Sequence, residues 1–532
     1  MRTFSSYGPV DKDLHFYVPR EDLVRRAREL LIGKDPEKGG HYITVWGPRQ
    51  TGKTWIMNEV VSQMDEKHPI CALKLSLEPF KMTSDVDRIL QKLSEEICRR
   101  LGLKTVTVRS IDEFDGLFKK GVLKRPLILL LDEFDALSEN AINAIVTIFR
   151  HIYIRRLEDD RPTAEKEYLL HGVALIGVRG VLGIENVTGS PFNVQRSLHI
   201  PNLSLSEVSA MFEWYGKESG RVIEPEVIHR IYDETRGQPG LVSWFGELLT
   251  EGYEGYRPNH QNSLTLEDFN SVFSDALDVL PNNTILNMVS KARQEPYKSL
   301  VLELFRTQTR PYFKLDDPRI SFLYMNGIVE REKENGQNYL RFSCPFVQKR
   351  LFGYFSRELF PHLGTLFEPF EDVRHILTDT DLDVTALIRR YEQHLQKNRG
   401  WMLANAPRRS DGRIYEAVFH FNLYEFLIRF FDSYPTKIWP EFPTGNGKVD
   451  ILIDHGGTLH ALEIKSYKDQ PAFRQALIQA AGYGASLKMD RIHLVVFVDG
   501  ITDAHRETYE VDVTDKITHV TVSPVLVDTG GA

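Results

Sequence analysis

Gly47-Pro-Arg-Gln-Thr-Gly-Lys-Thr54 is the stretch that decides the fold of this 532-residue sequence. It fits the pattern G-x-x-x-x-G-K-[S/T], whose glycines let a loop curl so that its backbone N–H groups face phosphate oxygens. An apolar run, Tyr42–Trp46, precedes the loop, and a helical pattern, Trp55–Met64, follows it. This strand–loop–helix context predicts a nucleotide site in which Lys53 contacts the β- and γ-phosphates and Thr54 binds Mg²⁺.

An acidic pair ends a second apolar run. Asp132 and Glu133 follow Leu127–Leu131, a run with the length and composition of a buried strand. In a nucleotide site of this kind, such an aspartate holds Mg²⁺ through water, and the neighbouring residue orients and deprotonates the attacking water. We therefore assign Asp132 to the metal and Glu133 to catalysis.

The sequence around these motifs alternates between strand and helix patterns. Further strands are expected at 70–75 and 173–178, and further helices at 86–101 and 140–155. Because such alternation is typical of parallel sheets, we predict an α/β fold with helices on both faces of the sheet.

The length of the chain requires several domains. From about residue 205 the pattern is helical, and further on two apolar-rich runs flank Asn335-Gly336, which is a strong hairpin signal. Helices followed by such a hairpin predict a winged helix. The expected segments are a P-loop ATPase core at 1–204, a helical lid at 205–280, a winged helix at 281–355, a helical connector at 356–400 and a separate α/β domain at 401–532.

A second group of charged residues lies in this last domain. Asp450 opens one strand-like run, and Glu463 and Lys465 lie in the next, across the turn His455-Gly-Gly-Thr458. Because side chains alternate along a strand, Glu463 and Lys465 face the same way, and Asp450 on the paired strand can meet them. Two carboxylates can hold Mg²⁺ or Mn²⁺ to activate water at a phosphodiester, with Lys465 stabilising the developing charge. The alternative is an ordinary amphipathic hairpin with a surface Glu–Lys pair.

Three further segments in the first half resemble the AAA-like and STAND P-loop ATPases, the group related to the archaeal ATPases. They are Phe16-Tyr-Val-Pro-Arg-Glu21, Ser190-Pro-Phe-Asn193 and Glu234-Thr-Arg-Gly-Gln-Pro-Gly-Leu241. With the two nucleotide motifs, the resemblance covers about residues 10–355. It implies an ATP site, slow switching between nucleotide states and a capacity to form homo-oligomers.

The same resemblance assigns roles to single residues. Pro239 is expected near the adenine and Arg179 near the γ-phosphate, and a surface arginine at a strand end is the alternative for Arg179. Arg196 is a further candidate arginine finger. The expected nucleotide-binding residues are Gly47, Gly52, Lys53, Thr54, Asp132, Arg179 and Pro239, with Thr54 and Asp132 at the Mg²⁺ ion.

The spacing of Asp450, Glu463 and Lys465 resembles the PD-(D/E)XK nuclease superfamily, over residues 401–532. The resemblance implies that Glu416, at the first turn of a helix, adds an acidic ligand, and Glu425 competes with it for this role. Asp450 and Glu463 are the implied metal ligands.

Other residues also match the superfamily. Gln479, with Tyr483, is expected on the helix after the core strands, and Glu441 is a candidate fourth acid. Val449 stands where the family name has a proline, which leaves the metal ligands unchanged. The implied catalytic residues of the nuclease site are Asp450, Glu463, Lys465, Glu416 and Gln479.

The composition limits the protein classes that fit. With 66 Lys plus Arg against 74 Asp plus Glu, the net charge is −8, which argues against a surface covered in positive charge for nonspecific nucleic-acid binding. The three cysteines lack CxxC spacing, and no stretch approaches 18 apolar residues. We expect a cytoplasmic protein with no membrane partner.

A local basic cluster remains compatible with this balance. Lys397, Arg399, Arg408, Arg409 and Arg413 surround an aromatic residue ahead of the nuclease helix. They could follow a nucleic-acid backbone, and a solvated linker is the alternative. The expected wing is rich in glutamate, so we assign the winged helix to regulation instead of DNA reading.

Together these patterns predict an ATP-binding, ATP-hydrolysing protein that regulates a C-terminal Mg²⁺-dependent nuclease. Nucleic acid is the expected partner, with DNA favoured over RNA, and prokaryotic defence fits this pairing by association alone. The rival hypothesis is a nucleotide-switched scaffold whose nuclease fold is inactive and only binds nucleic acid or protein.

Overall fold

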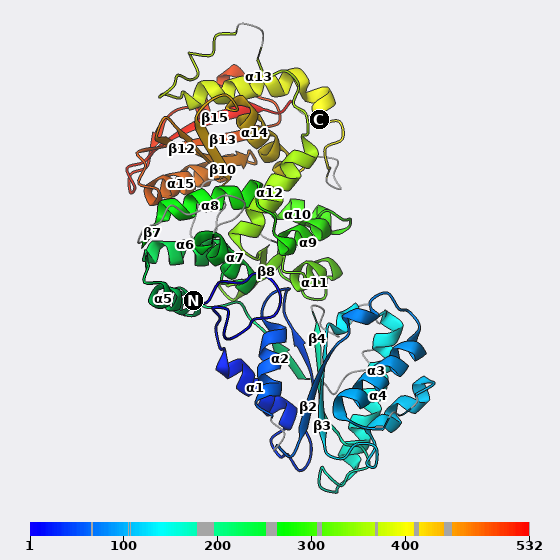
Figure 1. Ribbon diagram of the computed structural model, residues 1–532. Helices are drawn as coiled ribbons and strands as arrows, with labels where there is room; N and C mark the ends of the chain where they lie inside the picture. The colour runs from blue at the N-terminus through cyan, green and yellow to red at the C-terminus, as the bar shows by residue number, and fades with distance from the viewer. Residues whose placement is uncertain are drawn as a thin grey trace. The chain divides into compact units, whose positions relative to one another are not determined.

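The computed structural model describes residues 1–64, 68–104, 106, 108–177, 196–251, 263–305, 311–367, 371–408, 414–440 and 450–530, with only the backbone of Glu416 (Figure 1). The chain forms two compact units. The first contains Met1–Ser274 and Lys314–Val329, and the second contains Asp275–Phe313 and Glu330–Ala532. No helix in the described ranges is long and apolar enough to cross a lipid bilayer.

The first unit is built on a five-stranded sheet of order β2-β3-β4-β1-β5. Its strands are β1 (Tyr42–Trp46), β2 (Cys71–Ser76), β3 (Leu127–Asp132), β4 (Leu170–Gly177) and β5 (Arg196–His199). Every pairing is parallel. All residues of β3 and β4 are buried, as expected for central strands that are covered on both faces. The predicted parallel sheet is confirmed.

Helices cover the two faces of this sheet. Helices α1 (Glu21–Ile32) and α2 (Lys53–Ser62) pack on one face, and α3 (Val86–Leu101) and α4 (Glu139–Glu158) pack on the other (Figure 1). Each of the last two begins at a side chain that accepts a backbone N–H, from Asp85 and from Ser138. The two apolar layers hold the loop between β1 and α2 at one edge of the sheet.

The predicted helical region follows. Its helices are α5 (Leu205–Ser219), α6 (Pro225–Thr235), α7 (Pro239–Thr250) and α8 (Leu266–Asp278), with a short parallel pair of β6 (Val222–Ile223) and β7 (Ser263–Leu264). Helix α5 begins with a capping box between Ser204 and Glu207. Helix α7 begins with Pro239 at its first position, where the missing N–H costs nothing.

Three shorter helices and a hairpin come next. They are α9 (Asn283–Ala292), α10 (Tyr297–Leu304), α11 (Pro318–Met325), β8 (Val329–Glu334) and β9 (Gln337–Phe342), followed by α12 (Pro345–Leu359). Asn335 and Gly336 both have positive φ, which matches the twist of a two-residue hairpin turn. The predicted hairpin is confirmed. Helix α11 belongs to the first compact unit, whereas α9 and α10 belong to the second.

The second unit carries a six-stranded mixed sheet of order β10-β11-β12-β13-β15-β14. The strands are β10 (Thr436–Pro440), β11 (Ile451–His455), β12 (Thr458–Ser466), β13 (Arg491–Val498), β14 (Val513–Thr514) and β15 (Thr521–Asp528). Strands β10, β11 and β12 are antiparallel, and β12, β13 and β15 are parallel. The predicted β11–β12 hairpin is confirmed.

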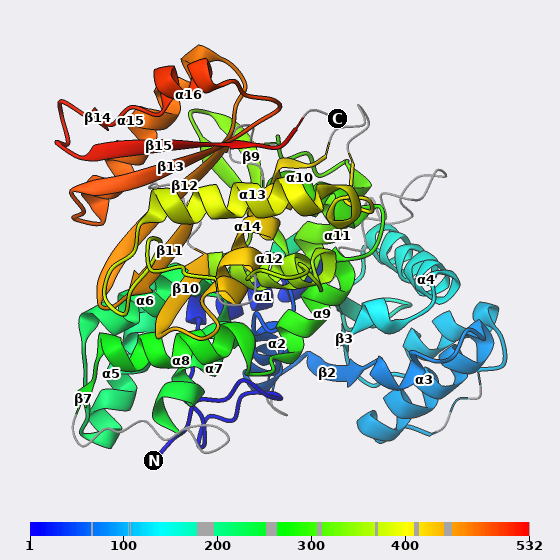
Figure 2. The same ribbon diagram turned by 90° about the horizontal axis from the view of Figure 1, so that it is seen from above.

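Four helices accompany this sheet. They are α13 (Val384–Met402), α14 (Glu416–Phe430), α15 (Gln470–Ser486) and the short α16 (Asp503–Tyr509). Figure 2 shows α13 and α14 along one side of the strands and α15 on the other. Helix α13 is fixed to β15, because Arg389 donates a hydrogen bond of 2.6 Å to the Leu526 carbonyl. Between α12 and α13, the described residues form no helix.

Candidate active sites

The phosphate-binding loop follows β1 directly. A Cβ on Gly47 would lie 3.0 Å from both the Ile200 carbonyl oxygen and Thr51 Oγ1, so a side chain there would push against the neighbouring backbone. Gly52 has a φ of 88° and stands just before α2. Only glycine adopts this conformation without strain, which explains both glycines of the motif.

Lys53 is held by the loop itself. Its Nζ donates to the carbonyl oxygens of Gly47 at 2.8 Å and Pro48 at 2.6 Å. Burial lowers the pKa of Lys53 to about 8. The loop carbonyls therefore partly replace the hydration of the ammonium group, and phosphate oxygens would be stronger acceptors at the same position.

Thr54 and Asp132 converge on one point, as the sequence predicted. The Thr54 hydroxyl donates to Asp132 Oδ2 at 2.9 Å. Both supply oxygen atoms, the ligands that Mg²⁺ prefers, so this pair fits the ion. Lys74 on β2 was not predicted: its Nζ lies 3.2 Å from the same Asp132 oxygen and donates to Asn58.

Glu133 lies at the edge of the site. Its backbone has a φ of 56°, its side chain is exposed, and its N–H donates to Asp132 Oδ1 at 3.0 Å. The Ser76 hydroxyl, at the end of β2, donates to Glu133 Oε2 at 2.6 Å. Ser76 was also missed by the sequence analysis, because nothing in the sequence pairs the end of one strand with the end of the next.

The start of α7 closes over the loop. The Gln238 side-chain amide donates to the Arg49 carbonyl at 3.0 Å, and the Gly240 N–H donates to the Gln50 carbonyl at 3.1 Å. A Cβ on Gly240 would lie only 2.2 Å from Gln50 Oε1. Pro239, expected near the adenine, therefore stands in the turn that touches the phosphate-binding loop.

The structure describes only one of the two arginines that were expected at the nucleotide. Arg179 and the segment 190–193 lie outside the described residues. Arg196 begins β5 and pairs with Ile43, three residues before the end of β1. Burial, with nearby Arg196, lowers the pKa of His41. Arg196 thus lies toward the opposite end of the strand from the loop and does not reach its own chain's phosphate site.

In the second unit, Asp450 stands where the β11–β12 ladder ends. Its N–H donates to the Leu462 carbonyl at 3.0 Å, and its Oδ2 accepts the Ile464 N–H at 2.7 Å. The carboxylate therefore substitutes for a missing backbone partner of β12. This contact holds Asp450 beside the segment that carries Glu463 and Lys465.

Glu463 and Lys465 form a buried pair next to Asp450. Lys465 Nζ lies 2.5 Å from Glu463 Oε1 and forms an ion pair with it. Glu463 Oε2 is buried and has no hydrogen-bond partner among the described residues. Burial raises the pKa of Asp450 and of Glu463. Burial alone would lower the pKa of Lys465, but the two carboxylates keep it above its usual value.

The described donors supply two carboxylates, which are part of the ligand set that a divalent cation takes. An unpartnered buried carboxylate oxygen is costly without a ligand, and Asp450 supplies a second carboxylate to the same place. The described residues contain no group of three or more His, Cys, Asp or Glu side chains that could hold a metal. The side chain of Glu416 and the whole of Glu441 fall outside the described residues.

Helix α15 contributes Gln479 and Tyr483, as expected. The Gln479 amide donates to the Tyr483 hydroxyl. Lys465 and Gln479 both line a cavity of about 230 Å³ beside α15. Burial raises the pKa of Tyr483, and the nearby Glu463 adds to this effect. The buried acid–lysine group is therefore reached from this cavity.

Glu425, the competitor of Glu416 for the role of acidic ligand, lies further along helix α14. Glu425 Oε1 accepts a hydrogen bond of 2.8 Å from Ser356 on α12, and burial raises its pKa. It points to α12, away from Asp450 and Glu463. His420, one turn after Glu416, is buried, and burial together with nearby Lys465 lowers its pKa to about 3. The sequence analysis missed His420, although its helical spacing from Glu416 was a usable signal.

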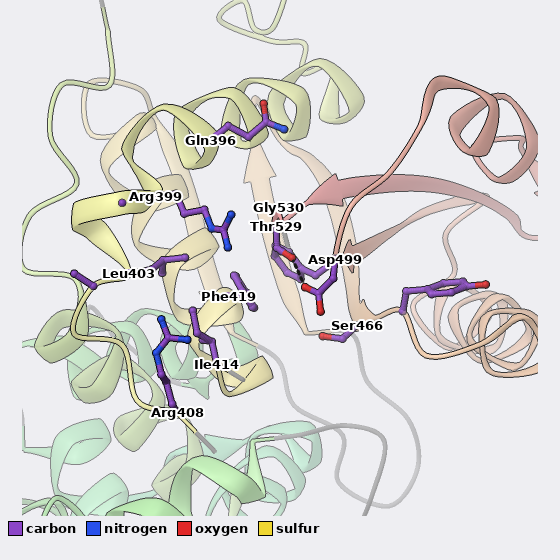
Figure 3. A pocket seen from close by; sticks show the side chains of 14 residues that line it. Gln396, Arg399, Leu403, Arg408, Ile414, Phe419, Ser466, Asp499, Thr529 and Gly530 are labelled. Atoms are coloured by element: carbon purple, nitrogen blue, oxygen red, sulfur yellow. Dashed lines mark hydrogen bonds between the residues drawn. The ribbon is translucent and has the colours of Figure 1, made fainter. Parts of the chain in front are cut away.

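Part of the basic cluster lines a second cavity. Arg399 and Arg408 extend into a space of about 570 Å³ (Figure 3). Arg409 and Arg413 lie outside the described residues. The cavity also includes Ser466, the residue after Lys465.

Residues 5–251 match the family described as AAA-like domain. This part of the chain is therefore an AAA-like P-loop domain, a type of domain for which ATP with Mg²⁺ is the typical ligand. No curated protein matches the chain.

Several solved structures are similar to the chain at low identity. A Walker-type ATPase of Pyrococcus abyssi has 12% identity and a TM-score of 0.43, with 65% of this chain and 99% of that chain covered. Cdc6p from Pyrobaculum aerophilum has 16% identity and a TM-score of 0.35, with 66% and 99% covered. The Aeropyrum pernix ORC1 protein, solved in complex with DNA, has 16% identity and a TM-score of 0.33, with 63% and 92% covered.

Proposed function

We propose that this protein is an ATP-regulated nuclease that uses Mg²⁺ or Mn²⁺ to cut nucleic-acid phosphodiester bonds in its C-terminal domain. The observation that carries the proposal is the buried oxygen of Glu463, unpartnered among the described residues, beside Asp450 and Lys465. A buried carboxylate oxygen in this state supports a cation as its ligand. ATP binding by the AAA-like domain would regulate this nuclease activity.

In the ATPase domain, each residue has a distinct task. Lys53 exchanges its two carbonyl partners for phosphate oxygens, and Thr54 and Asp132 hold Mg²⁺. The bound ion supplies neutralisation of phosphate charge. Glu133 orients the attacking water and accepts its proton. Because Ser76 donates to Glu133, hydrolysis requires this carboxylate to turn from Ser76 toward the water.

In the nuclease domain, Asp450 and Glu463 would hold the cation, with Glu416 as a further acid. The cation supplies a water of lowered pKa and a positive charge at the scissile phosphate. Lys465, held beside Glu463, orients this water and stabilises the charge that develops on the phosphate oxygens. Gln479 lines the cavity that leads to this group and would contact the substrate, and Tyr483 accepts a hydrogen bond from Gln479 and holds it in place.

The partners follow from the two sites. Nucleic acid, with DNA favoured over RNA, is the substrate, and the chain works as a homo-oligomer whose arrangement responds to ATP. A glutamate-rich hairpin, β8–β9, is poorly suited to phosphate contact, which supports a regulatory role for the winged-helix segment. The second candidate function is a nucleotide-switched scaffold with an inactive nuclease fold.

The deciding experiment measures cleavage of plasmid, linear duplex, single-stranded DNA and RNA, with Mg²⁺ or Mn²⁺ and with or without ATP. Glu463→Gln should abolish cleavage, and Lys53→Ala should abolish its response to ATP. Glu425→Gln is the matched control, because this carboxylate is also buried in the second unit but contacts Ser356. No cleavage by the folded wild-type protein on any substrate would reject the nuclease and favour the scaffold.

A further inference from the structure

The larger cavity lies at the carboxyl ends of three parallel strands. Ser466 ends β12, and Asp499 and Thr529 follow β13 and β15. The other wall comes from the end of α13, from the bridge between Arg408 and Ile414, and from α14 (Figure 3). Its volume of about 570 Å³ is within the range of small-ligand sites.

The polar lining favours an anion. Arg399 and Arg408 reach into the space from one side, opposite Asp499 and Ser466 (Figure 3). Asp499 already accepts a hydrogen bond of 2.7 Å from the Thr529 hydroxyl. Gly530 leaves room for Arg399, because a Cβ there would lie 2.5 Å from the guanidinium. Two guanidinium groups at one cavity are the pattern that recognises phosphate.

The apolar lining favours a flat ring. Phe419 and Phe497 are stacked, with ring centroids 5.3 Å apart and an angle of 27° between planes, and both line the cavity. Phe497 is buried, whereas Phe419 is partly exposed. An aromatic face next to positive charge is how proteins hold an unpaired base with its phosphate.

The cavity adjoins the candidate cleavage site. Ser466 and Tyr467 line both this cavity and the smaller one that holds Lys465 and Gln479. Because Lys465 and Ser466 face opposite ways on β12, a nucleic-acid strand with one phosphate near Lys465 would reach the larger cavity around the end of β12, where Ser466 and Tyr467 line both cavities. A base that is paired and stacked in a duplex cannot enter such a cavity without leaving the stack.

We propose that the larger cavity binds one unpaired nucleoside monophosphate unit next to the scissile phosphate, with the phosphate on Arg399 and Arg408 and the base against Phe419. This inference rests on the proposed function and narrows it. The substrate is a single strand or an unpaired end, and an uninterrupted duplex is a poor substrate. A free nucleotide carries the same chemistry, so the test separates the two sources.

The test measures binding by full-length Glu463→Gln protein, which removes cleavage from the readout. The probes are a labelled single-stranded oligonucleotide, a closed-end duplex of the same sequence and a free deoxynucleoside monophosphate, followed by fluorescence anisotropy or calorimetry. Replacing Arg399→Ala and Arg408→Ala together should weaken single-strand binding at least tenfold. Lys516→Ala, which removes an exposed positive charge just before β15, at the opposite end of the strands from the cavity, should change it less than twofold.

A second double variant separates a loss of binding from a loss of folding. Arg399→Lys with Arg408→Lys keeps both charges but loses the planar fork, so it should weaken binding by an intermediate factor. Free nucleotide binding that is lost in the double alanine variant, without single-strand binding, would support the cavity as a site for a free ligand. Unchanged single-strand affinity in the folded double alanine variant, or tighter binding of the closed duplex, would overturn the inference.

These results are independent of cleavage. If the wild-type protein cuts nothing, but single-strand binding depends on Arg399 and Arg408, the nuclease proposal fails and the cavity remains a nucleotide site. If the protein cuts duplex and single strands equally and the arginine variants cut normally, the nuclease stands and the cavity inference fails.

Discussion

The two candidate sites of this chain differ in whether backbone or side-chain groups form them. In the first unit, the phosphate-binding lysine is satisfied by backbone, because Lys53 donates to two loop carbonyls, and Gly52 gives the loop its positive φ. In the second unit, the site consists of side chains on a strand pair, and Glu463 keeps one buried oxygen without a partner in the described residues. The lysine of the first site has its polar partners, whereas the second site leaves a buried carboxylate oxygen unpaired among the described residues, which costs free energy unless a ligand binds it.

This difference explains how each site can be recognised. A backbone site needs particular residues at fixed spacing, since few sequences let a loop curl with its N–H groups inward. A side-chain site needs only two acids and a lysine that meet in space, and such residues are common at any spacing. The first is therefore defined by its motif, and the second by burial and by what its carboxylates contact.

The largest expected effect tests the second site. Asp450→Asn should reduce metal-dependent cleavage by about 10³-fold or more, because the cation provides several kcal/mol of transition-state stabilisation. The amide oxygen of asparagine can still accept the Ile464 N–H, so the hairpin should remain folded. Initial cleavage rates measure the effect. Asp454→Asn on the same strand is the control. An equal loss of cleavage in this variant would show that the effect is not specific to Asp450 as a cation ligand.

The next prediction tests whether the loop depends on its backbone neighbours. Gly240→Ala should weaken ATP binding by about tenfold or more, since the new Cβ would lie 2.2 Å from Gln50 Oε1 and displace the loop. Calorimetry with ATP gives the dissociation constant. Gly116→Ala meets no atom within 4 Å and should leave ATP affinity unchanged. Normal ATP affinity in Gly240→Ala would show that the loop tolerates movement of α7.

A third prediction uses the charge state of Lys53. Burial lowers its pKa to about 8 without nucleotide, and phosphate should raise it, because phosphate stabilises the ammonium form. ATP binding therefore takes up a proton above pH 8, and the dissociation constant should rise by up to about tenfold per pH unit there. Calorimetry in two buffers of different ionisation enthalpy measures the proton uptake. A constant affinity from pH 7 to 9.5 would contradict this linkage.

The smallest effect concerns the resting contact of Glu133. Ser76→Ala removes a hydrogen bond of 2.6 Å and should raise the rate of ATP hydrolysis about threefold, in proportion to the modest net value of one such bond. Steady-state phosphate release measures this rate. Glu133→Gln should eliminate hydrolysis in the same assay. An unchanged rate in Ser76→Ala would mean that this contact does not restrain Glu133, and a lower rate would mean that the serine assists it.

Much of the fold was readable from local patterns. The strand Tyr42–Trp46 and the helix Val86–Leu101 have the predicted bounds, and the Asn335-Gly336 turn forms as its residue types require. The β11–β12 hairpin places Asp450 beside Glu463 and Lys465, as alternation along strands indicated. These features depend on neighbours in the sequence.

The residues that were missed depend on tertiary contacts. Lys74 reaches Asp132 only because β2 and β3 are adjacent in the sheet, and the sequence of neither strand predicts this order. Glu425 competed with the preferred Glu416 on the same helix, and only the contact with Ser356 on α12 shows what Glu425 binds. Arg196 looked close to the nucleotide, but the β1–β5 register puts it toward the other end of the strand.

The contact between the phosphate-binding loop and α7 also has a consequence for synthesis of the chain. Arg49 and Gln238, which form one of its hydrogen bonds, are 189 residues apart. At about 5–20 residues per second, the ribosome completes the second partner roughly 10–40 s after the first. A nascent chain therefore carries the phosphate-binding loop long before α7, and the contact between the two can form only late in translation.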